Sequence, residues 1–231
     1  IQLKGAGATN YSRRRDGKAT LTAMLREYLI SVAVHYLKIP TSRSLAVVKT
    51  GDEVYREEVH EGAVLTRVMK SHLRVGTFEF ARQFGTKEDL KALTDYTINR
   101  LYPEIKEDKK VVESFYLKVI HDQIDLICHW MRVGFIHGVM NTDNTSISSE
   151  TFDYGPCAFM NQYHPGTVYS SIDRNSRYAF GNQPHILKWN MVRLAETLLP
   201  LLDENSDKAI EIAQGLIDQF DIIWNAKYKI M

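Results

Sequence analysis

The hydrophobic pattern changes along the chain, because strand-like runs are confined to the first 70 residues. These runs, which are rich in β-branched residues, cover 1–4, 45–50, 54–58 and 63–69. Turns between them are predicted at Gly51-Asp52 and Glu61-Gly62. Helical spacing of apolar residues covers 20–37, 88–101, 110–134, 186–201 and 206–227. The pattern predicts an α+β fold with a small mixed strand and helix N-terminal lobe, residues 1–80, and a larger, mainly helical C-terminal lobe, residues 81–231.

The composition is typical of a globular protein and argues against two classes of partner. The chain has 29 Lys and Arg and 28 Asp and Glu, which gives a net charge of +1. Nucleic-acid binders that act through bulk charge are usually strongly basic, so we expect no nucleic-acid partner. No apolar run approaches the roughly 20 residues of a membrane span, and no signal-peptide pattern opens the chain. We therefore expect a soluble intracellular protein with no membrane partner.

Two smaller features complete this outline. The chain starts at Ile1, without a methionine and directly in a strand pattern, which predicts that an N-terminal part of the domain is missing. Cys128 and Cys157 are too few for a disulfide framework and fit no CxxC motif. Cys128 lies in an apolar helical stretch, which predicts a buried structural thiol.

An irregular stretch rich in Asn, Asp, Ser, Gly and Tyr extends from about 138 to 182, and such long loops are usually functional. His137 and Asn144 have the spacing of the kinase catalytic loop, and Asp153-Tyr154-Gly155 resembles the metal-binding turn that follows it. The position of the kinase base, however, is Val139, which cannot accept a proton. The oxygen atoms of Asn144 and Asp153 suit magnesium shared with phosphates. The alternative is an Asn- and Asp-rich turn that binds no metal.

Charged residues in the first third suggest a phosphate site. Lys4 in a strand and Glu27 in a helix match the pair with which kinases fix a cation on nucleotide phosphates. Arg67 and Arg74 could converge on one anion if the chain turns between them, and residues 13–15 add three arginines. The alternative for each of these residues is an ordinary solvated surface charge.

One other arrangement resembles a metal site. His121, Asp125 and His129 share a helix face. The outer two would be about 12 Å apart at the rise of an α-helix, which is too far for one metal ion. We therefore expect no zinc site here.

Taken together, these motifs resemble the selenoprotein O family, also called the YdiU family, of protein adenylyltransferases. The segments that carry the resemblance occur in family order and are QLKGAG at 2–7, YSRR at 11–14 with Asp16-Gly17, IPT at 39–41, GAVLTRV at 62–68, SHLRVG at 71–76, VGF at 133–135, HGVMNTDN at 137–144, DYGP at 153–156, SRYAF at 176–180 and NQP at 182–184. HGVMNTDN and DYGP are the most specific of these segments. The family also has a glycine-rich segment upstream of the opening strand, which this chain lacks.

The resemblance implies a protein-kinase-like fold that binds ATP in a flipped orientation, so that AMP is transferred to Ser, Thr or Tyr hydroxyls of proteins. It implies that Lys4 contacts the phosphates and that Glu27 holds Lys4. Asp16 and Gly17 would line the nucleotide site. A bacterial member would be cytoplasmic, and a eukaryotic member mitochondrial.

The resemblance also implies the remaining roles. Arg67 and Arg74 would clamp the far phosphates. Asn144 and Asp153 would bind Mg²⁺, or Mn²⁺ in its place, and Asp153 would also face the nucleotide. Asp143, the neighbour of Asn144, would act as general base. Three alternatives stay open: a nucleotide-binding pseudokinase, a UMP transferase that uses UTP, and a true kinase, which Val139 disfavours.

Overall fold

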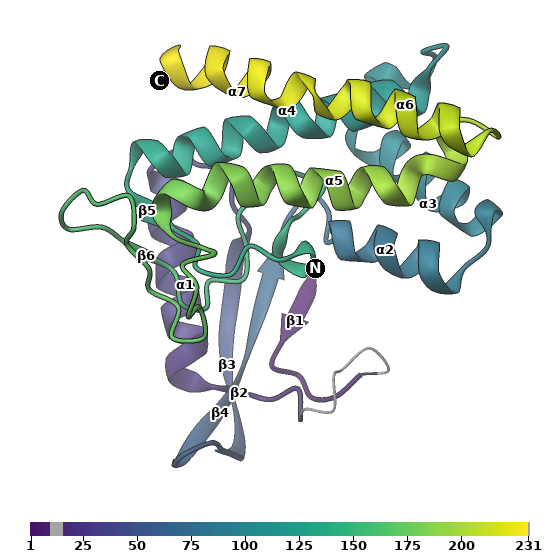
Figure 1. Cartoon of the computed structure of the whole chain (residues 1–231). Coiled ribbons are helices and arrows are strands. Elements are labelled where there is room, and N and C mark those ends of the chain that lie inside the picture. The colour runs from purple at the N-terminus through teal and green to yellow at the C-terminus, as the bar shows by residue number, and fades with distance from the viewer. Residues whose placement is uncertain (10–15, 231) are drawn as a thin grey trace. The chain divides into compact units, whose positions relative to one another are not determined.

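The computed structural model describes residues 1–9 and 16–230 (Figure 1). It contains two compact units. The first comprises Ile1–His72 with Glu150–Gly155, and the second comprises Leu73–Ser149 with Pro156–Met231. The three arginines at 13–15, which were predicted to add to the phosphate site, lie outside the described residues. Both units contain helices and strands, as expected for an α+β protein, and most of the strands lie in the first unit.

The first unit is a four-stranded antiparallel sheet with one helix. Its strands are β1 (Gln2–Lys4), β2 (Ala19–Thr20), β3 (Arg43–Tyr55) and β4 (Val59–Val68). β4 pairs with all three others, so β3 occupies one edge of β4, and β1 and β2 follow each other along the opposite edge. Helix α1 (Leu21–Tyr36) packs on the sheet through Met24, which contacts Ala63 and Leu65 in the core.

The predicted helix at 20–37 and the opening strand are confirmed, but the strand boundaries between 45 and 69 are wrong in two places. The runs at 45–50 and 54–58 form one strand, β3, because the register shifts between Lys49 and Glu53 instead of ending the strand. Gly51 takes φ +79° at this irregularity, a conformation that glycine adopts easily. Glu61-Gly62 lies inside β4. The turn is instead at 56–58, where the Arg56 N–H donates to the Glu58 carbonyl at 3.0 Å.

The second unit is mainly helical. Its helices are α2 (Val75–Phe84), α3 (Lys87–Leu101), α4 (Val111–Arg132), α5 (Gln183–Leu202), α6 (Ser206–Ile217) and α7 (Gln219–Ile230), with a short 3₁₀ turn at Pro103–Ile105. α5 runs through the middle of this unit and packs against α2, α4 and α6 (Figure 1). A buried hydrogen bond helps to hold α5 against α4, because the Tyr116 hydroxyl of α4 donates to the Met191 carbonyl of α5 at 2.9 Å.

Three of the predicted helices in this unit are confirmed, and two features were not predicted. Helix α2 was not predicted, because it is only ten residues long and the segment before it shows no helical spacing of apolar residues. The predicted helix at 206–227 is wrong as a single helix, because α6 ends at Ile217 and α7 begins at Gln219. The Asp218 N–H still donates to the Gln214 carbonyl at 3.0 Å, so helical hydrogen bonding continues up to the boundary between the two helices.

The irregular stretch is confirmed and contains only short elements. These are β6 (Ala158–Phe159) and the 3₁₀ turns Thr142–Asn144 and Phe180–Asn182, and β5 (Phe135–Ile136) directly precedes the stretch. β5 and β6 pair antiparallel. Cys128 is buried as predicted, and burial raises the pKa of its thiol to about 11. Within residues 1–9 and 16–230, no helix is both long and apolar enough to span a membrane.

Candidate functional site

Four charged side chains meet in the first unit and form a closed set of ion pairs. Lys4 Nζ lies 2.7 Å from Glu27 Oε2, and Arg67 Nη2 lies 2.7 Å from Asp153 Oδ1. Lys4 also pairs with Asp153, and Arg67 with Glu27. The structure thus brings Lys4 and Glu27 together, and their contact is one of four in a larger cluster. We call Lys4, Glu27, Arg67 and Asp153 the ion cluster.

The register of the sheet explains why these side chains meet. Gln2 pairs with Arg67 across β1 and β4, so the two side chains share one face of the sheet. Lys4 is two residues further along β1 and points to the same face. Leu65 of β4 shares this face and packs against Met24 of α1. Glu27 is three residues beyond Met24 on the helix, which brings its carboxylate to the two cations.

The ion cluster has a buried half and an accessible half. The side chains of Glu27 and Arg67 are 2% and 3% exposed, whereas those of Lys4 and Asp153 are each 30% exposed. The guanidinium of Arg67 is buried and already bonded to Glu27, Asp153 and Gln2, so little of it is accessible to a ligand. The accessible groups are therefore Lys4 and Asp153, one cation and one anion.

Asp153 is held as a carboxylate. Burial alone raises the pKa of its side chain, but the charges and hydrogen bonds of Lys4 and Arg67 outweigh burial and hold the pKa well below its usual range. Its backbone has φ +65°, an uncommon conformation for a residue other than glycine. An ionised oxygen donor of this kind fits a hard divalent cation such as magnesium.

A cavity of about 460 Å³ opens beside the ion cluster in the first unit. Besides Lys4 and Glu27, its wall includes four basic side chains that the sequence did not single out, namely Lys18, Arg26, Arg56 and His60. Lys18 and Arg56 pair with Asp52 and Asp16, but the lining itself still has more basic than acidic side chains, which suits a polyanion such as a nucleotide triphosphate.

Arg26 ties helix α1 to the turn that carries Asp153. Its Nη1 donates to the Tyr154 carbonyl at 3.2 Å and also to the Gly155 carbonyl. Arg26 precedes Glu27 directly, so one helical turn supplies both the acid of the ion cluster and a clamp on its Asp153 loop. The only sequence signal for Arg26 is this position beside Glu27.

Asp16 and Gly17 directly precede Lys18, which lines this cavity, but they do not line it themselves. The Asp16 carboxylate forms a two-pronged ion pair with Arg56, at 2.8 and 3.0 Å. Gly17 has φ +65°, and a Cβ there would lie 2.1 Å from the Gly7 carbonyl oxygen, so no other residue fits. Their predicted role at the nucleotide remains a prediction.

The second unit contains the loop from His137 to Asn144. His137 is buried and stacks on Trp130, with ring centroids 5.4 Å apart. Asn144 Nδ2 donates to the Val139 carbonyl at 2.9 Å, so residue 139 contributes its backbone to the loop. Asn190 of α5 donates to the Met140 carbonyl at 2.9 Å. The loop is thus fixed by hydrogen bonds to its backbone.

Asp143 lies against the first turn of α2. A Cβ added to Gly76 would lie 2.5 Å from Asp143 Oδ1, so this close approach requires glycine. Arg74 is the N-cap residue of α2, and the Val75 N–H donates to the Thr145 carbonyl at 3.0 Å. The start of α2 and the loop that carries Asp143 and Asn144 are therefore one local structure.

The ion cluster belongs to the first unit, whereas Arg74, Asp143 and Asn144 belong to the second. A metal held jointly by Asn144 and Asp153, and an anion held jointly by Arg67 and Arg74, remain predictions. Among the described residues, no group of three or more His, Cys, Asp and Glu could hold a metal. In the His121, Asp125 and His129 set, Asp125 forms an ion pair of 2.6 Å with Lys227.

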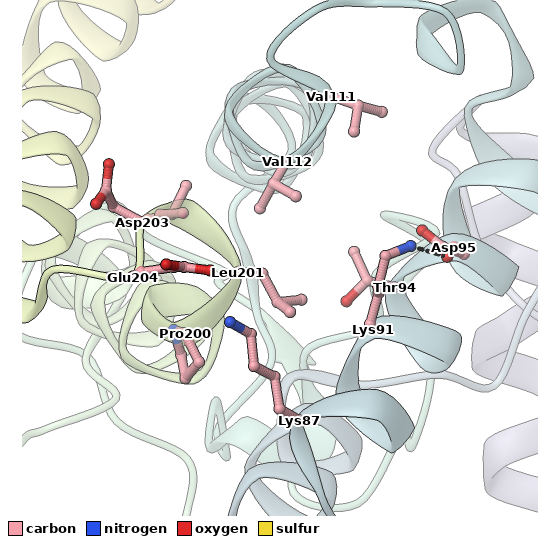
Figure 2. Close-up of a pocket in the computed structure, with 11 residues that line it drawn as sticks. Lys87, Lys91, Thr94, Asp95, Val111, Val112, Pro200, Leu201, Asp203 and Glu204 are labelled. Carbon is pink, nitrogen blue, oxygen red and sulfur yellow. Dashed lines mark hydrogen bonds and ion pairs between the residues drawn. The ribbon is translucent and has the colours of Figure 1, made fainter.

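A further cavity of about 460 Å³ lies in the second unit, between α3, the start of α4 and the end of α5 (Figure 2). Its wall combines lysines, acids and aliphatic side chains, and Lys91 and Asp95 pair with each other on it at 2.6 Å. None of the predicted site residues lines it. It therefore has no part in the proposed chemistry.

The family model described as "Protein adenylyltransferase SelO" matches residues 1–231, and the chain belongs to this family. Curated relatives named "Protein nucleotidyltransferase YdiU" include one from Clostridium botulinum (strain Alaska E43 / Type E3), 60% identical over 97% of this chain and 46% of its own length. Others come from Bacillus cereus (strain B4264), 56% identical over 99% of this chain and 47% of the relative, and Brevibacillus brevis (strain 47 / JCM 6285 / NBRC 100599), 57% identical over 99% and 46%. The chain spans about half the length of the curated relatives it matches.

Proposed function

We propose that this chain is the nucleotide-transfer part of a protein adenylyltransferase, which moves AMP from ATP to Ser, Thr or Tyr hydroxyls of proteins. The observation that carries the proposal is the ion cluster, in which Lys4 and Asp153 are accessible beside a cavity of about 460 Å³ whose wall includes several basic side chains. The family match supports nucleotidyl transfer to proteins as the class of reaction. We also propose a protein-kinase-like fold and, from the bacterial relatives, a bacterial cytoplasmic location.

In the proposed reaction, a substrate hydroxyl attacks the α-phosphorus of ATP. The bond between that phosphorus and the oxygen bridging to the β-phosphate breaks, and diphosphate leaves. Asp143 takes the hydroxyl proton, because its carboxylate can accept a proton and the side chain of Val139 cannot. The family sequence motif and the close packing of the Asp143 side chain against Gly76 support this role.

The cationic groups have the task of stabilising the charge that develops on diphosphate, which is the main source of catalysis in such transfers. Lys4 contacts the phosphates, with Glu27 holding its ammonium in place. Arg74 binds the far phosphates. We assign Arg67 chiefly to holding Glu27 and Asp153, because its guanidinium is buried against both.

Asn144 and Asp153 are the residues that would hold Mg²⁺ or Mn²⁺. The metal would supply positive charge to the phosphates when bound. The low pKa of Asp153 supports this assignment, because the side chain is ready to bind a cation without losing a proton. Asp16 and Gly17 would shape the nucleotide site indirectly, through the turn that they form with Arg56 and Gly7.

The test is label transfer from ATP to protein, with α-labelled and γ-labelled nucleotide in parallel. It is run on this chain and on a chimaera that adds the remaining segments of the Clostridium botulinum relative, each with an Asp143→Ala control. We expect protein label from the α-position only, lost in the control. Label from the γ-position would mean a kinase. ATP binding without any transfer would mean a pseudokinase, and preference for α-labelled UTP would mean a UMP transferase.

A further inference from the structure

The second unit presents a cationic and aromatic surface for which the proposed chemistry has no use. Trp189 of α5 is 38% exposed. The guanidinium carbon of Arg177 lies 4.6 Å from the centre of its indole ring system, and that of Arg193 lies 5.5 Å away. Arg177 also lies 5.8 Å from the Tyr178 ring. We call Arg177, Trp189 and Arg193 the arginine–tryptophan platform.

Arg177 is presented by a well-defined turn. Asp173 accepts hydrogen bonds from the backbone N–H groups of Arg177 and Tyr178, at 2.9 and 2.7 Å. Ser176, between them, has φ +55°. The Asp173 carboxylate therefore binds the backbone, and the Arg177 side chain lies over the indole. Stacking on a ring leaves the N–H edges of a guanidinium open to a carboxylate.

The charge on this stretch is not compensated locally. Asp173 is the only acidic residue from Pro156 to Met191, although the chain as a whole has 28. Arg174 and Arg177 are both exposed, and within the described part of the chain neither forms an ion pair. Arg193 pairs with Glu196 through Nη2, while its Nε is buried without a hydrogen-bond partner. Among the described residues, Arg177 is therefore the cation of the platform that no acidic side chain pairs, and it lies over the Trp189 ring.

Helix α5 connects this platform to the loop that carries Asp143. Asn190, the residue after Trp189, donates to the Met140 carbonyl at 2.9 Å. Gln183, at the start of α5, accepts from the His137 N–H at 3.1 Å and donates to the Phe135 carbonyl at 3.0 Å. A ligand bound on the exposed side of α5 is thus held by the same helix that fixes the loop from inside.

We propose that the arginine–tryptophan platform docks an acidic segment of the protein that receives the nucleotide. This inference rests on the proposed function, since it specifies the kind of protein substrate. A carboxylate would form a two-pronged pair with Arg177, and a neighbouring side chain would pack on Trp189. Nucleic acid fits less well, because two uncompensated arginines are a small fraction of the contacts that a phosphate backbone requires.

The test is fluorescence anisotropy with a labelled peptide in which serine is flanked by Glu and Asp, and a matched peptide with Gln and Asn in their place. Binding is measured without ATP, so that it does not depend on transfer. We expect the acidic peptide to bind, and Arg177→Glu to weaken it by about tenfold or more. Arg177→Lys should weaken it less, because an ammonium ion cannot form the two-pronged pair.

The matched control is Arg82→Glu, an equal charge change at an exposed arginine on α2 of the same unit. It should leave peptide binding within about twofold, because charge at a distance is largely screened by salt. Circular dichroism of every variant checks that the fold is retained. Equal weakening by Arg82→Glu and Arg177→Glu, or equal binding of the Gln and Asn peptide, overturns the proposal.

Two further arms separate the remaining outcomes. Arg177-dependent binding of a short single-stranded RNA or of phosphatidylserine vesicles, without peptide binding, also overturns the proposal. The Asp143→Ala variant should bind the acidic peptide normally. If AMP transfer fails while Arg177-dependent peptide binding persists, the proposed function falls and the docking surface stands. If transfer succeeds while no peptide binding depends on Arg177, only the docking surface falls.

Discussion

The two units hold their functional residues by different means. In the first unit, Lys4, Glu27, Arg67 and Asp153 hold one another through four ion pairs, and the Arg67–Glu27 pair is buried on both sides. In the second unit, Asp143 and Asn144 sit in a loop that is fixed by backbone hydrogen bonds and by the glycine at position 76. The difference suggests that changes in the first unit affect stability and ligand binding together, whereas changes in the second affect chemistry with little loss of stability.

The largest expected effect breaks the ion cluster from inside. Glu27→Gln leaves the buried Arg67 without its inner partner, and removing one member of a buried pair costs about 3–5 kcal/mol. Urea unfolding measures the loss of stability. The control is Glu61→Gln, which removes the exposed pair with Lys49 and should cost less than about 1 kcal/mol. Equal losses in the two variants would mean that burial of the cluster does not matter.

The next effect displaces the proposed base without touching it. Gly76→Ala places a methyl group 2.5 Å from Asp143 Oδ1, so the carboxylate must move. We expect AMP transfer by the chimaera to fall by about 10- to 100-fold, since small misplacements of a catalytic group have effects of this size. Gly215→Ala, which meets nothing within 4 Å, is the control and should leave transfer unchanged. Unchanged transfer in Gly76→Ala would show that Asp143 is not the base.

A smaller effect separates positioning from charge in the first unit. Arg26→Gln removes the donor to the Tyr154 and Gly155 carbonyls, which loosens the turn that carries Asp153. We expect affinity for Mg-ATP, measured by isothermal titration calorimetry, to fall by about tenfold. Arg26→Lys keeps the charge and should recover only part of this loss. Full recovery by lysine would mean that Arg26 acts through its charge alone.

The smallest effect concerns pH, measured in EDTA so that no metal contributes. The pKa of Asp153 is lower in the folded state, so its ion pairs stabilise the fold above the ordinary pKa of about 3.8 and are lost as pH falls toward the folded value. The difference in unfolding free energy between the wild type and Asp153→Asn should stay constant from pH 8 to 5 and shrink below about 4. A difference that shrinks already between pH 7 and 5 would show that the ion pairs are weaker than the geometry indicates.

Much of this fold follows from sequence pattern. Helices α1, α3, α4 and α5 have regular apolar spacing, and the pattern predicted them within a few residues. The merged strand β3 did not follow, because Gly51-Asp52 has the composition of a turn and only pairing with β4 converts it into an irregularity within a strand. The boundary between α6 and α7 at Asp218 did not follow either, because neither Asp218 nor its two neighbours in sequence is a glycine or proline.

The site was predictable in part for the same reason. Lys4 and Glu27 could be paired from their motif, and the structure joins them. The burial of Arg67 could not be predicted, because it depends on the register of β1 against β4 and on Glu27 facing the same side. Arg26 and Gly76 also escaped prediction, since their importance comes from contacts with residues far away in sequence.

The most direct test of the roles assigned to Asp143 and Asp153 compares Asp153→Asn with Asp143→Asn in the chimaera. Calorimetry gives the affinity for Mg-ATP, and single-turnover transfer of α-label gives the rate of chemistry. We expect Asp153→Asn to lose affinity for Mg-ATP, whereas Asp143→Asn binds Mg-ATP normally and loses transfer by about 10²- to 10⁴-fold. If Asp143→Asn loses affinity as much as Asp153→Asn does, or transfers label at the wild-type rate, the division of roles between the two units is wrong.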